Sequence, residues 1–534
     1  MAYIAPNSTI EFFGDVSLAP DQEDTLYFAS TSAKDSYFSG LTKLATFTQQ
    51  SYTRKERGFI RVEATMAQLY TACYMRFKNT SFENKWFYAF VLSVNYVNNI
   101  TVEVEFQIDV MMSWMGAFQL SQCFVERQHT VGDAIGANIA DEGLNLGLYV
   151  CEDTDYYSLG DPVVMMYKSY NADEGDVRPA TIQQGTYNPL ATYAYFLDDT
   201  NLALLETHLN TLTADNRIDE IITMKLVPSK YVTNSEAVPW YNKNVSKPYN
   251  TIGGSEYVPH NKKLYTYPYK YLRVENGEGQ STVYKYEYFN TLPDETSSGN
   301  CEFQIRGIAN TPQVAIMCTP LRYNGMSADY DQSINMTNFP SLAWNVDTYK
   351  AYLAQRDSTI YGEMLASTIA GATGGALSGA IHGGGAGAAI GAVAGAASGV
   401  IGGSKTLLSD TLNELMSGSL PARMPDQTRG RAESDIMMQS GYKNFWFRKM
   451  SITKNYAMMI DSFFDMYGYA IRQKAVPNMN ARPYYTYVKT KGCVVHGSIP
   501  ADDCRVIESI FDNGIRFWKN HNQIGDYSVN NAPT

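Results

Sequence analysis

The sequence predicts a mixed, β-rich fold that is divided among several domains. Its 534 residues exceed the roughly 250 to 300 residues at which a single hydrophobic core stops growing, so we expect two to four domains. Hydrophobic residues make up 45% and charged residues 18%, a balance typical of a folded chain. The 40 tyrosines favour extensive interfaces, because a tyrosine ring combines a large contact area with a polar tip. A β-rich oligomer is therefore the starting hypothesis.

Two β-rich runs within residues 85–114 predict a hairpin in the N-terminal β-rich part, which we bound at 1–150. The runs are separated at Asn98 and Asn99, and the second run alternates apolar and polar residues as a half-buried strand does. The apolar face consists of Val102, Val104, Phe106 and Ile108. The opposite face, which we expect to meet solvent or a lumen, consists of Glu103, Glu105, Gln107 and Asp109.

The pattern of residues 151–350 predicts an inserted α+β middle domain. A helix is expected near Thr200 to Leu212, and tyrosine-rich strands are expected at 262–275 and 281–290. Two clusters of Asn, Asp, Ser and Gly indicate surface loops, at 291–300 and 324–333.

The C-terminal part, residues 421–534, returns to short strands and helices. We expect a strand within 445–457, then a helix that reaches Tyr467, a break at Pro477 and a strand at 484–490.

A last helix is expected between Pro500 and Gly514. Proline suits the first position of a helix, and glycine can end one. The apolar face of this helix consists of Ile507, Ile510 and Phe511.

The segment Met364 to Ser404 differs from the rest of the chain and forms most of a predicted hydrophobic Gly/Ala loop at 351–420. Its 41 residues include 13 glycines and 12 alanines and no Asp, Glu, Lys or Arg. Nine glycines recur at every fourth position, a tandem of the motif that lets helices approach closely in membranes: Gly371, Gly375, Gly379, Gly383, Gly387, Gly391, Gly395, Gly399 and Gly403. The larger apolar side chains are Leu365, Ile369, Leu377, Ile381, Ile390, Val393, Val400 and Ile401.

The length of this segment fits a membrane hairpin. As a continuous helix it would reach ~61 Å at ~1.5 Å per residue, about two crossings of a ~30 Å hydrocarbon core. The triple glycine at 383–385 is the natural hinge between an arm at 364–382 and an arm at 386–404. His382 lies at the hinge, where a neutral imidazole would make insertion sensitive to acidity; a hydrogen-bonded loop histidine is the alternative.

The composition of the segment makes insertion conditional. Each interior glycine costs ~1 kcal/mol relative to alanine, so thirteen would cost roughly 10 kcal/mol in a helix in water. The eight Leu, Ile and Val residues contribute only about −0.3 to −0.6 kcal/mol each to insertion, so several copies must act together. We therefore predict a shielded, releasable membrane-active segment. The alternatives are a flexible loop between domains and, more weakly, a nucleotide-binding loop at Gly385 to Gly387, which no β-rich run precedes.

The charge of the chain argues against a DNA-gripping surface. The formal net charge is −12 and the pI about 5.1, which suits a conduit through which DNA slides without sequence-specific binding. The N-terminus carries Glu11 and Asp15 where a signal peptide would be apolar, so we expect synthesis in the cytoplasm without export.

Patterns that carry chemistry are weak, so we predict no enzyme, no cofactor and no metal site. Cys493 and His496 would lie on opposite faces of a strand, and the pairs Asp153/Asp155 and Asp502/Asp503 lack a complete Ca²⁺ ligand ladder. The odd, scattered cysteines are expected to be reduced core thiols: Cys73, Cys123, Cys151, Cys301, Cys318, Cys493 and Cys504.

Strings at both chain ends carry a resemblance to a known family. In the N-terminal part they lie at 84–90, 106–110, 114–115, 125–127 and 141–145. In the C-terminal part they lie at 477–478, 487–488, 490–491, 493, 510–515, 518, 525 and 527–529. In these strings the chain resembles the tail knob, or distal tail tube, proteins of the small protein-primed podoviruses (Picovirinae type) that infect Gram-positive bacteria. Little from about 155 to 349 can be matched.

The resemblance implies tail-tube-like β-barrel or sandwich domains, built by both chain ends, in a homohexamer around a DNA channel. It implies partners among other tail proteins (collar and tail tip), host membrane lipids, and DNA passing through the lumen. It also implies that hydrophobic loops plug the channel and later form a pore in the host membrane. We expect a virion tail protein that inserts at the host membrane on infection. The alternatives are a receptor-binding protein, a cell-wall-degrading tail protein and a free pore-forming toxin.

Overall fold

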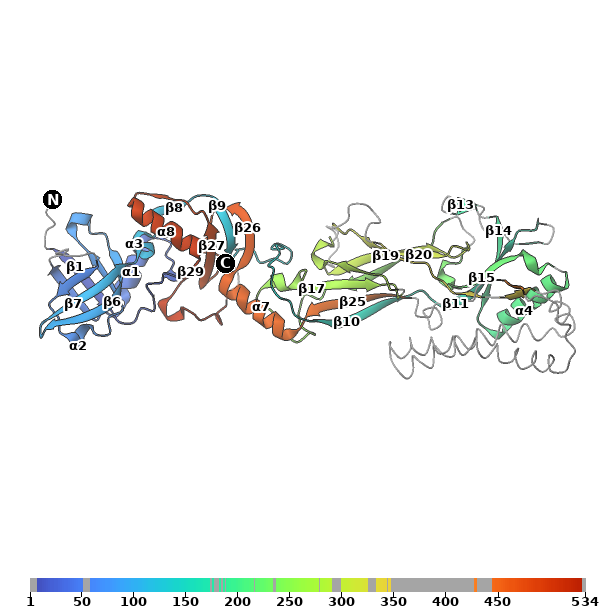
Figure 1. The fold of residues 1–534 in the computed structure, drawn as a ribbon, viewed down its shortest axis with the longest axis horizontal. Helices are drawn as coiled ribbons and strands as arrows, with labels where there is room; N and C mark the ends of the chain where they lie inside the picture. Colours follow the sequence, from blue (N-terminus) through green and yellow to red (C-terminus); the bar gives the residue numbers. More distant parts are fainter. Residues whose placement is uncertain are drawn as a thin grey trace. The chain divides into compact units, whose positions relative to one another are not determined.

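The computed structural model describes two compact units of the chain. The described residues are 7–50, 58–172, 175–176, 182–183, 186–187, 189–215, 217–233, 237–277, 279–290, 299–324, 333–342, 344–346, 427–429 and 444–530. The first unit, here called the end unit, comprises Met1–Tyr149, Asn250–Tyr269 and Ile452–Thr534; the second, the middle unit, comprises Val150–Tyr249 and Lys270–Ser451. Both units consist mainly of β-sheets with a few short helices (Figure 1), which confirms the predicted β-rich, multidomain class.

A six-stranded antiparallel sheet forms the first half of the end unit, in the order β3-β1-β5-β6-β7-β4. Its strands are β1 (Ser8–Phe13), β3 (Ala45–Gln50), β4 (Phe59–Val62), β5 (Tyr74–Lys78), β6 (Phe87–Asn98) and β7 (Thr101–Ile108). The pairing of Asn98 with Thr101 closes the predicted hairpin. Val102, Val104 and Phe106 are buried, as the alternation predicts.

A five-stranded sheet joins the two ends of the chain, in the order β2-β29-β27-β9-β26. Its strands are β2 (Asp24–Leu26), β9 (Cys123–Gln128), β26 (Tyr469–Ala475), β27 (Tyr485–Lys491) and β29 (Ile515–Trp518). β2 lies parallel to β29, whereas the other neighbours are antiparallel. A smaller pair, β8 (Phe118–Leu120) with β28 (Val495–Gly497), repeats this joining of early and late residues.

Short helices cover the sheets of the end unit. They are α1 (Thr31–Gly40), α2 (Met66–Leu69), α3 (Val110–Trp114), α7 (Lys454–Tyr467) and α8 (Ala501–Asn513), with 3-10 turns η1 (Thr80–Phe82), η5 (Lys262–Tyr265) and η7 (His521–Gln523). The predicted apolar face of α8 is buried at Ile507, Ile510 and Phe511. Pro500 precedes the helix as its N-cap, one position earlier than predicted, and Gly514 ends it with φ +100°.

Three four-stranded sheets make up most of the described middle unit. Their orders are β10-β25-β17-β18, β14-β11-β15-β22 and β16-β19-β20-β21. The strands are β10 (Tyr149–Ser158), β11 (Pro162–Ser169), β14 (Leu190–Phe196), β15 (Ile221–Pro228), β16 (Trp240–Ser246), β17 (Lys270–Glu275), β18 (Ser281–Tyr284), β19 (Asn300–Ile308), β20 (Ala315–Leu321), β21 (Ile334–Met336), β22 (Ser341–Leu342) and β25 (Asn444–Ile452). One hydrophobic core runs through all three sheets.

Smaller elements complete this unit. They are the pairs β12 (Ile182–Gln183) with β13 (Thr186–Tyr187) and β23 (Trp344–Val346) with β24 (Gln427–Arg429), the helix α4 (Asp199–Ala214), and the 3-10 turns η3 (Ile218–Glu220), η4 (Ser229–Tyr231) and η6 (Tyr286–Tyr288). The α4 helix confirms the prediction for this stretch.

Two tyrosine-rich stretches are shorter as strands than predicted. Within 262–275, the structure has a 3-10 turn and then β17, because Pro268 offers no N–H group to a strand ladder. Within 281–290, the strand β18 ends at Tyr284 and η6 follows. The predicted loops at 291–300 and 324–333 lie almost entirely outside the described residues.

Two further predictions need correction, and one strand was missed. Asp109 was expected on the polar face of β7, but it is buried because it caps α3 and accepts a hydrogen bond from Met112 N at 2.9 Å. The strand β26 was not predicted. All seven cysteines are free thiols, but Cys151 is exposed and does not belong to a core. The four-part division at 1–150, 151–350, 351–420 and 421–534 stays a prediction.

Candidate functional site

The predicted membrane-active segment, Met364 to Ser404, lies outside the described residues. The same is true of every glycine and apolar residue predicted to act in this segment, from Leu365 to Gly403. Among the residues that the structure describes, no helix is both long enough and apolar enough to cross a membrane.

The candidate reactive groups are placed in structural positions. Cys493 is buried, and burial raises the pKa of its thiol to about 12, whereas His496 is exposed on β28. Asp503 accepts a hydrogen bond from the Trp114 indole at 2.8 Å, and Asp153 pairs with Lys449 at 2.9 Å. The described part of the chain holds no group of three or more His, Cys, Asp or Glu side chains that could bind a metal ion.

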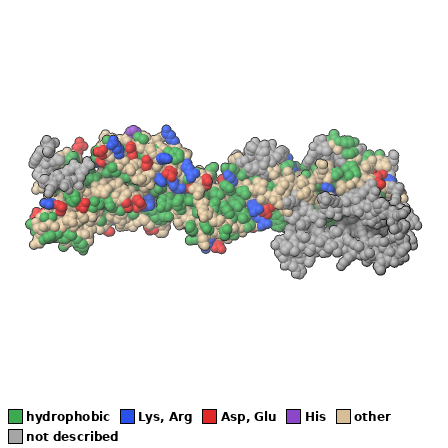
Figure 2. All heavy atoms as spheres, viewed as in Figure 1, with side chains coloured by type: hydrophobic (Ala, Val, Ile, Leu, Met, Phe, Trp, Pro, Cys, Tyr) green, Lys and Arg blue, Asp and Glu red, His purple; other side chains and the backbone are tan. Residues whose placement is uncertain are grey.

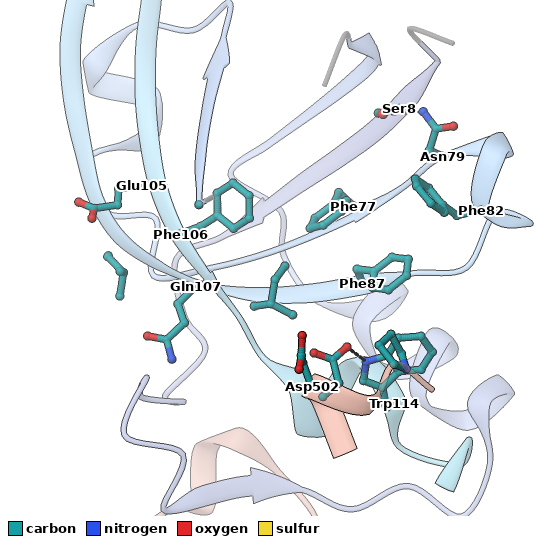
Figure 3. A pocket seen from close by; sticks show the side chains of 15 residues that line it. Ser8, Phe77, Asn79, Phe82, Phe87, Glu105, Phe106, Gln107, Trp114 and Asp502 are labelled. Carbon is teal, nitrogen blue, oxygen red and sulfur yellow. Dashed lines mark hydrogen bonds between the residues drawn. The ribbon is translucent and has the colours of Figure 1, made fainter. Parts of the chain in front are cut away.

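A cavity of about 890 Å³ lies in the end unit between the six-stranded sheet and the start of α8. We call it the aromatic groove (Figure 3). Its lining residues come from β1, from the residue before β4, from the β5–η1–β6 region, from β7 and α3, and from the start of α8 with the proline before it. They are Ser8, Gly58, Phe77, Asn79, Phe82, Phe87, Leu92, Glu105, Phe106, Gln107, Ile108, Trp114, Pro500, Asp502 and Asp503.

Aromatic rings form a continuous row along this groove. Phe106 and Phe77 have ring centroids 6.0 Å apart, and Phe77 stacks on Phe87 at 5.7 Å. Phe87 then contacts Trp114 edge to face at 5.7 Å, and Phe82 meets Phe87 at 6.2 Å. Such offset and edge-to-face pairs are the arrangement that aromatic quadrupoles favour, so the row is a packed wall and not a set of loose side chains.

A lysine already occupies one end of the row. The Lys85 ammonium lies 3.2 Å from the centroid of the Trp114 ring, and 5.4 Å from that of Phe87. Partial burial lowers the pKa of Lys85 to about 8, although the Asp503 carboxylate acts in the opposite direction. The face of an indole ring is the preferred aromatic partner of a cation, so this end of the groove shows cation–π binding within the chain itself.

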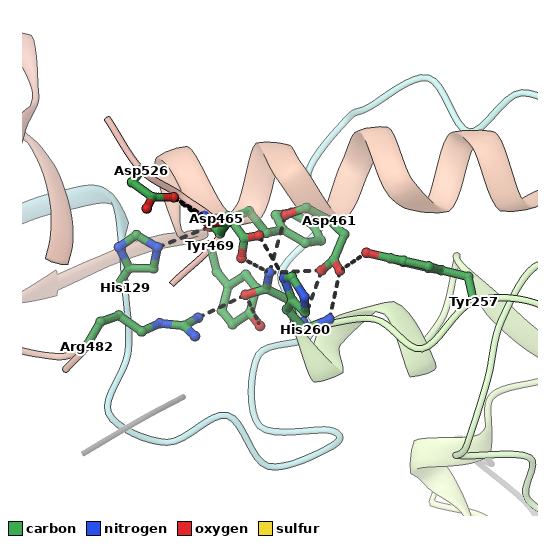
Figure 4. A network of polar contacts seen from close by, with 11 residues as sticks. His129, Tyr257, His260, Asp461, Asp465, Tyr469, Arg482 and Asp526 are labelled. Atoms are coloured by element: carbon green, nitrogen blue, oxygen red, sulfur yellow. Dashed lines mark hydrogen bonds and ion pairs between the residues drawn. The ribbon is translucent and has the colours of Figure 1, made fainter. Parts of the chain in front are cut away.

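A buried polar network lies elsewhere in the end unit, where α7 meets the segment 250–269. We call it the α7 network. Asp461 and Asp465 project from α7 toward this segment (Figure 4). Asp461 accepts hydrogen bonds from Tyr257 Oη at 2.6 Å, from His260 N at 2.7 Å, and from the backbone and side chain of Asn261 at 3.0 and 2.9 Å. Asp465 accepts from the Asn261 amide at 2.7 Å.

Histidine and arginine extend the network into the five-stranded sheet. Arg482 Nη2 donates to the Asn261 side-chain oxygen at 2.9 Å. His129 Nδ1 accepts from Tyr487 N at 2.7 Å, so its Nε2 must be the donor to the Phe464 carbonyl at 3.1 Å. Burial, with Arg482 nearby, holds the pKa of His129 well below its usual value. The imidazole is therefore neutral and committed to the backbone, which is a structural role.

Charges on the described surface are mixed in sign. On the described part of the face drawn in Figure 2, Lys and Arg side chains are interspersed with Asp and Glu side chains among apolar and neutral ones. Interspersed signs do not create the single-sign field that steers polyanions to a protein.

A comparison with known families decides what kind of protein this is. The family model described as the C-terminal domain of the Bacillus phage phi29 tail knob protein gp9 matches residues 228–532, more than half of the chain. The chain belongs to the tail knob protein family. A second model, described as the N-terminus of the caudoviral major tail protein, matches residues 6–119.

Whole-chain comparisons agree with membership of the tail knob family. The chain is 26% identical to the tail knob protein gp9 of Bacillus phage PZA over 99% of this chain and 100% of that protein. It is 25% identical to the tail knob proteins gp9 of Bacillus phages B103 and phi29, with the same coverage. The solved bacteriophage C1 tail knob protein gp12 has the same fold, with a TM-score of 0.63 at 13% identity over 98% of this chain and 99% of that one.

Membership of the tail knob family confirms the predicted resemblance and class. The named relatives are structural tail knob proteins and not enzymes, so this chain is a structural component of a phage tail. Sequence reasoning missed the aromatic groove, although its rings gather in one short stretch at Phe77, Phe82 and Phe87. The α7 network was also missed, since its members are about 200 residues apart.

Proposed function

We propose that this tail knob protein forms the distal tube of a short phage tail as a homohexamer. In this proposal the segment Met364 to Ser404 closes the DNA channel before infection and penetrates the host cell membrane during genome ejection. The observation that carries the proposal is the uncharged run of 41 residues with its glycines at every fourth position. Side-chain charges are costly in hydrocarbon, and regularly spaced glycines let helix backbones pack closely there.

A sixfold assembly would supply the insertion free energy that one copy of the segment lacks. Since eight Leu, Ile and Val residues give only marginal insertion energy, six segments acting together provide enough apolar surface and enough helix contacts. The membership of both chain ends in one sheet supports a tube wall built from both. The net charge of −12 supports a lumen through which DNA passes without being held. A collar protein and a tail-tip protein are the expected neighbours at the two ends of the tube.

Dye release from liposomes tests the membrane proposal. The intact protein should release dye, whereas a variant lacking 364–404 should not, with light scattering used to show that both assemble alike. Val393→Lys is a matched variant that keeps the segment length but places a charge near the centre of the second arm. It should reduce release strongly, because a lysine at the centre of a membrane helix costs about 3 kcal/mol on the insertion scale. Release that survives the deletion would refute membrane penetration by this segment.

Exposed aromatic side chains of the middle unit support a second candidate, receptor binding. Several are at least half exposed: Tyr156 at 53%, Tyr187 at 64%, Phe196 at 50% and Trp240 at 58%. Aromatic side chains are enriched at protein interfaces relative to the rest of a protein surface, so these four are candidates for contact with a receptor. If this candidate is correct, added tail knob protein will compete with phage for adsorption to host cells, and Trp240→Ala will weaken that competition.

A further inference from the structure

We propose that the aromatic groove of the end unit is a docking site for another tail protein. The occupant is a short segment that carries a lysine or arginine side chain beside apolar side chains. This proposal depends neither on the homohexamer nor on membrane insertion, because all of its observations come from described residues of the end unit.

The apolar lining of the groove is accessible. Phe82, one ring of the row, is 51% exposed and Leu92 is 46% exposed, and both line the groove. Exposing apolar surface costs roughly 25 cal/mol for each Å², and concave apolar surface with a polar rim typically marks a binding site. The volume of about 890 Å³ accommodates several side chains together, which favours a peptide segment over a single small ion.

The charged residues at the rim of the groove indicate the charge of its occupant. Among the described residues that line the groove, the charged ones are Glu105, Asp502 and Asp503. The Lys85 ammonium over the Trp114 ring offsets the charge of Asp503, which leaves Glu105 and Asp502. Glu105 accepts a hydrogen bond from Ser93 Oγ at 2.9 Å, which fixes its position without neutralising it. The Asp502 side chain is 81% exposed and lies 3.7 Å from the equally exposed Arg505, a contact too solvated to satisfy its charge. A cationic partner complements this rim, whereas a nucleic acid or a phosphate headgroup would be repelled.

The intramolecular lysine shows how the groove recognises a cation. Lys85 lies on the face of Trp114 while the Trp114 indole N–H donates to Asp503. This arrangement uses the Trp114 end of the row and leaves the exposed Phe82 ring and the partly buried Phe77 ring, with Glu105 and Asp502 in the same lining, for a partner. A lysine or arginine from a partner would contact ring faces and carboxylates there, and its apolar neighbours would cover Phe82 and Leu92.

Site-specific photo-crosslinking in assembled virions identifies the occupant. p-Benzoylphenylalanine replaces Phe82 in one variant and Leu92 in a second, and each virion is irradiated before its proteins are separated and sequenced by mass spectrometry. The control places the same group at Tyr96, which is 61% exposed on the same hairpin but outside the groove. Incorporation into virions shows that each variant folds.

The proposal requires crosslinks from positions 82 and 92 to one other tail protein, at a segment containing Lys or Arg, without the same product from position 96. The paired change Glu105→Gln and Asp502→Asn should lower the crosslink yield about fivefold, in keeping with the loss of two exposed or half-exposed ion pairs. Crosslinks to a second copy of this chain would overturn the proposal in favour of a subunit contact. Absence of crosslinks, products with DNA or lipid, or an unchanged yield in the neutralised variant would also overturn it.

Discussion

The aromatic groove and the α7 network use the same residue types in opposite ways. Both combine aromatic rings with carboxylates inside the end unit. In the α7 network, the Asp461 oxygens accept four hydrogen bonds from the chain itself, and the group is 1% exposed. In the groove, the carboxylates of Asp502 and Glu105 face a cavity. Carboxylates whose oxygens accept hydrogen bonds from the chain itself therefore hold this fold together, whereas carboxylates at an open apolar surface are available to a partner.

The largest expected effect comes from breaking the α7 network. Asp461→Ala leaves the donors of Tyr257, His260 and Asn261 without their acceptor in a buried place, so the free energy of unfolding should fall by about 4 kcal/mol. Urea denaturation of the assembled protein measures this. The matched change Asp461→Asn keeps one carbonyl acceptor and should cost about half as much. Equal stability of the alanine variant and the parent would contradict a supporting role for the network.

The buried cap of α3 gives the next largest effect, and it depends on pH. Burial raises the pKa of Asp109 to about 6, with Lys34 and Tyr74 as its charged and titratable neighbours. Since the ordinary value is 3.8, the folded state binds the proton more tightly than the unfolded state. This group's contribution to stability is therefore fully present below about pH 4 and is lost as pH rises through 6.

Asp109→Asn tests this sign, because an amide still caps α3 and does not titrate. As pH rises from 4 to 7, the stability of the variant relative to the parent should improve by about 2 kcal/mol, most of the effect of a difference of about two pKa units. Parallel urea denaturation curves at the two pH values measure the difference. A constant offset between variant and parent would show that Asp109 keeps its ordinary pKa.

A smaller effect is expected where the groove carries its own cation. Trp114→Phe removes the indole donor to Asp503 and weakens the contact with Lys85, so stability should fall by about 1.5 kcal/mol. The pKa of Lys85 should rise from about 8 toward its ordinary value of 10.5 as the site opens to water. Titration of ¹⁵N-labelled lysine follows this shift. An unchanged pKa would show that the contact with Trp114 does not determine the pKa of Lys85.

The smallest effect on stability is expected for the carboxylates of the groove. Asp502→Asn should change the free energy of unfolding by less than about 0.5 kcal/mol, because exposed ion pairs contribute little. The same result is expected for Glu105→Gln, whose amide oxygen still accepts from Ser93. Thermal unfolding measures both. A loss as large as that of Asp461→Ala would mean that the groove carboxylates are structural after all.

Local periodicity in the sequence predicted much of the fold. It predicted little of the candidate sites, because these depend on contacts between residues that are far apart in the chain. The hairpin β6–β7, the helices α4 and α8 and the strand β27 follow from patterns within about ten to twenty residues. Asp109 was misplaced because alternation assigns a face but does not reveal that the next residue begins a helix that needs a cap. The α7 network requires Asn261 to meet Asp461, 200 positions later, and no pattern in one sequence records such a contact.

The parallel pair β2–β29 has a consequence for the synthesis of this protein. Arg516 bonds Asp24, which lies 492 positions earlier, so the five-stranded sheet is incomplete until β29 has been synthesised. At about 5 to 20 residues per second, the ribosome needs roughly 25 to 100 s to supply the missing strand. The nascent chain therefore cannot complete this sheet before β29 is made, so a chain that stops short of Ile515 lacks a strand of the end unit.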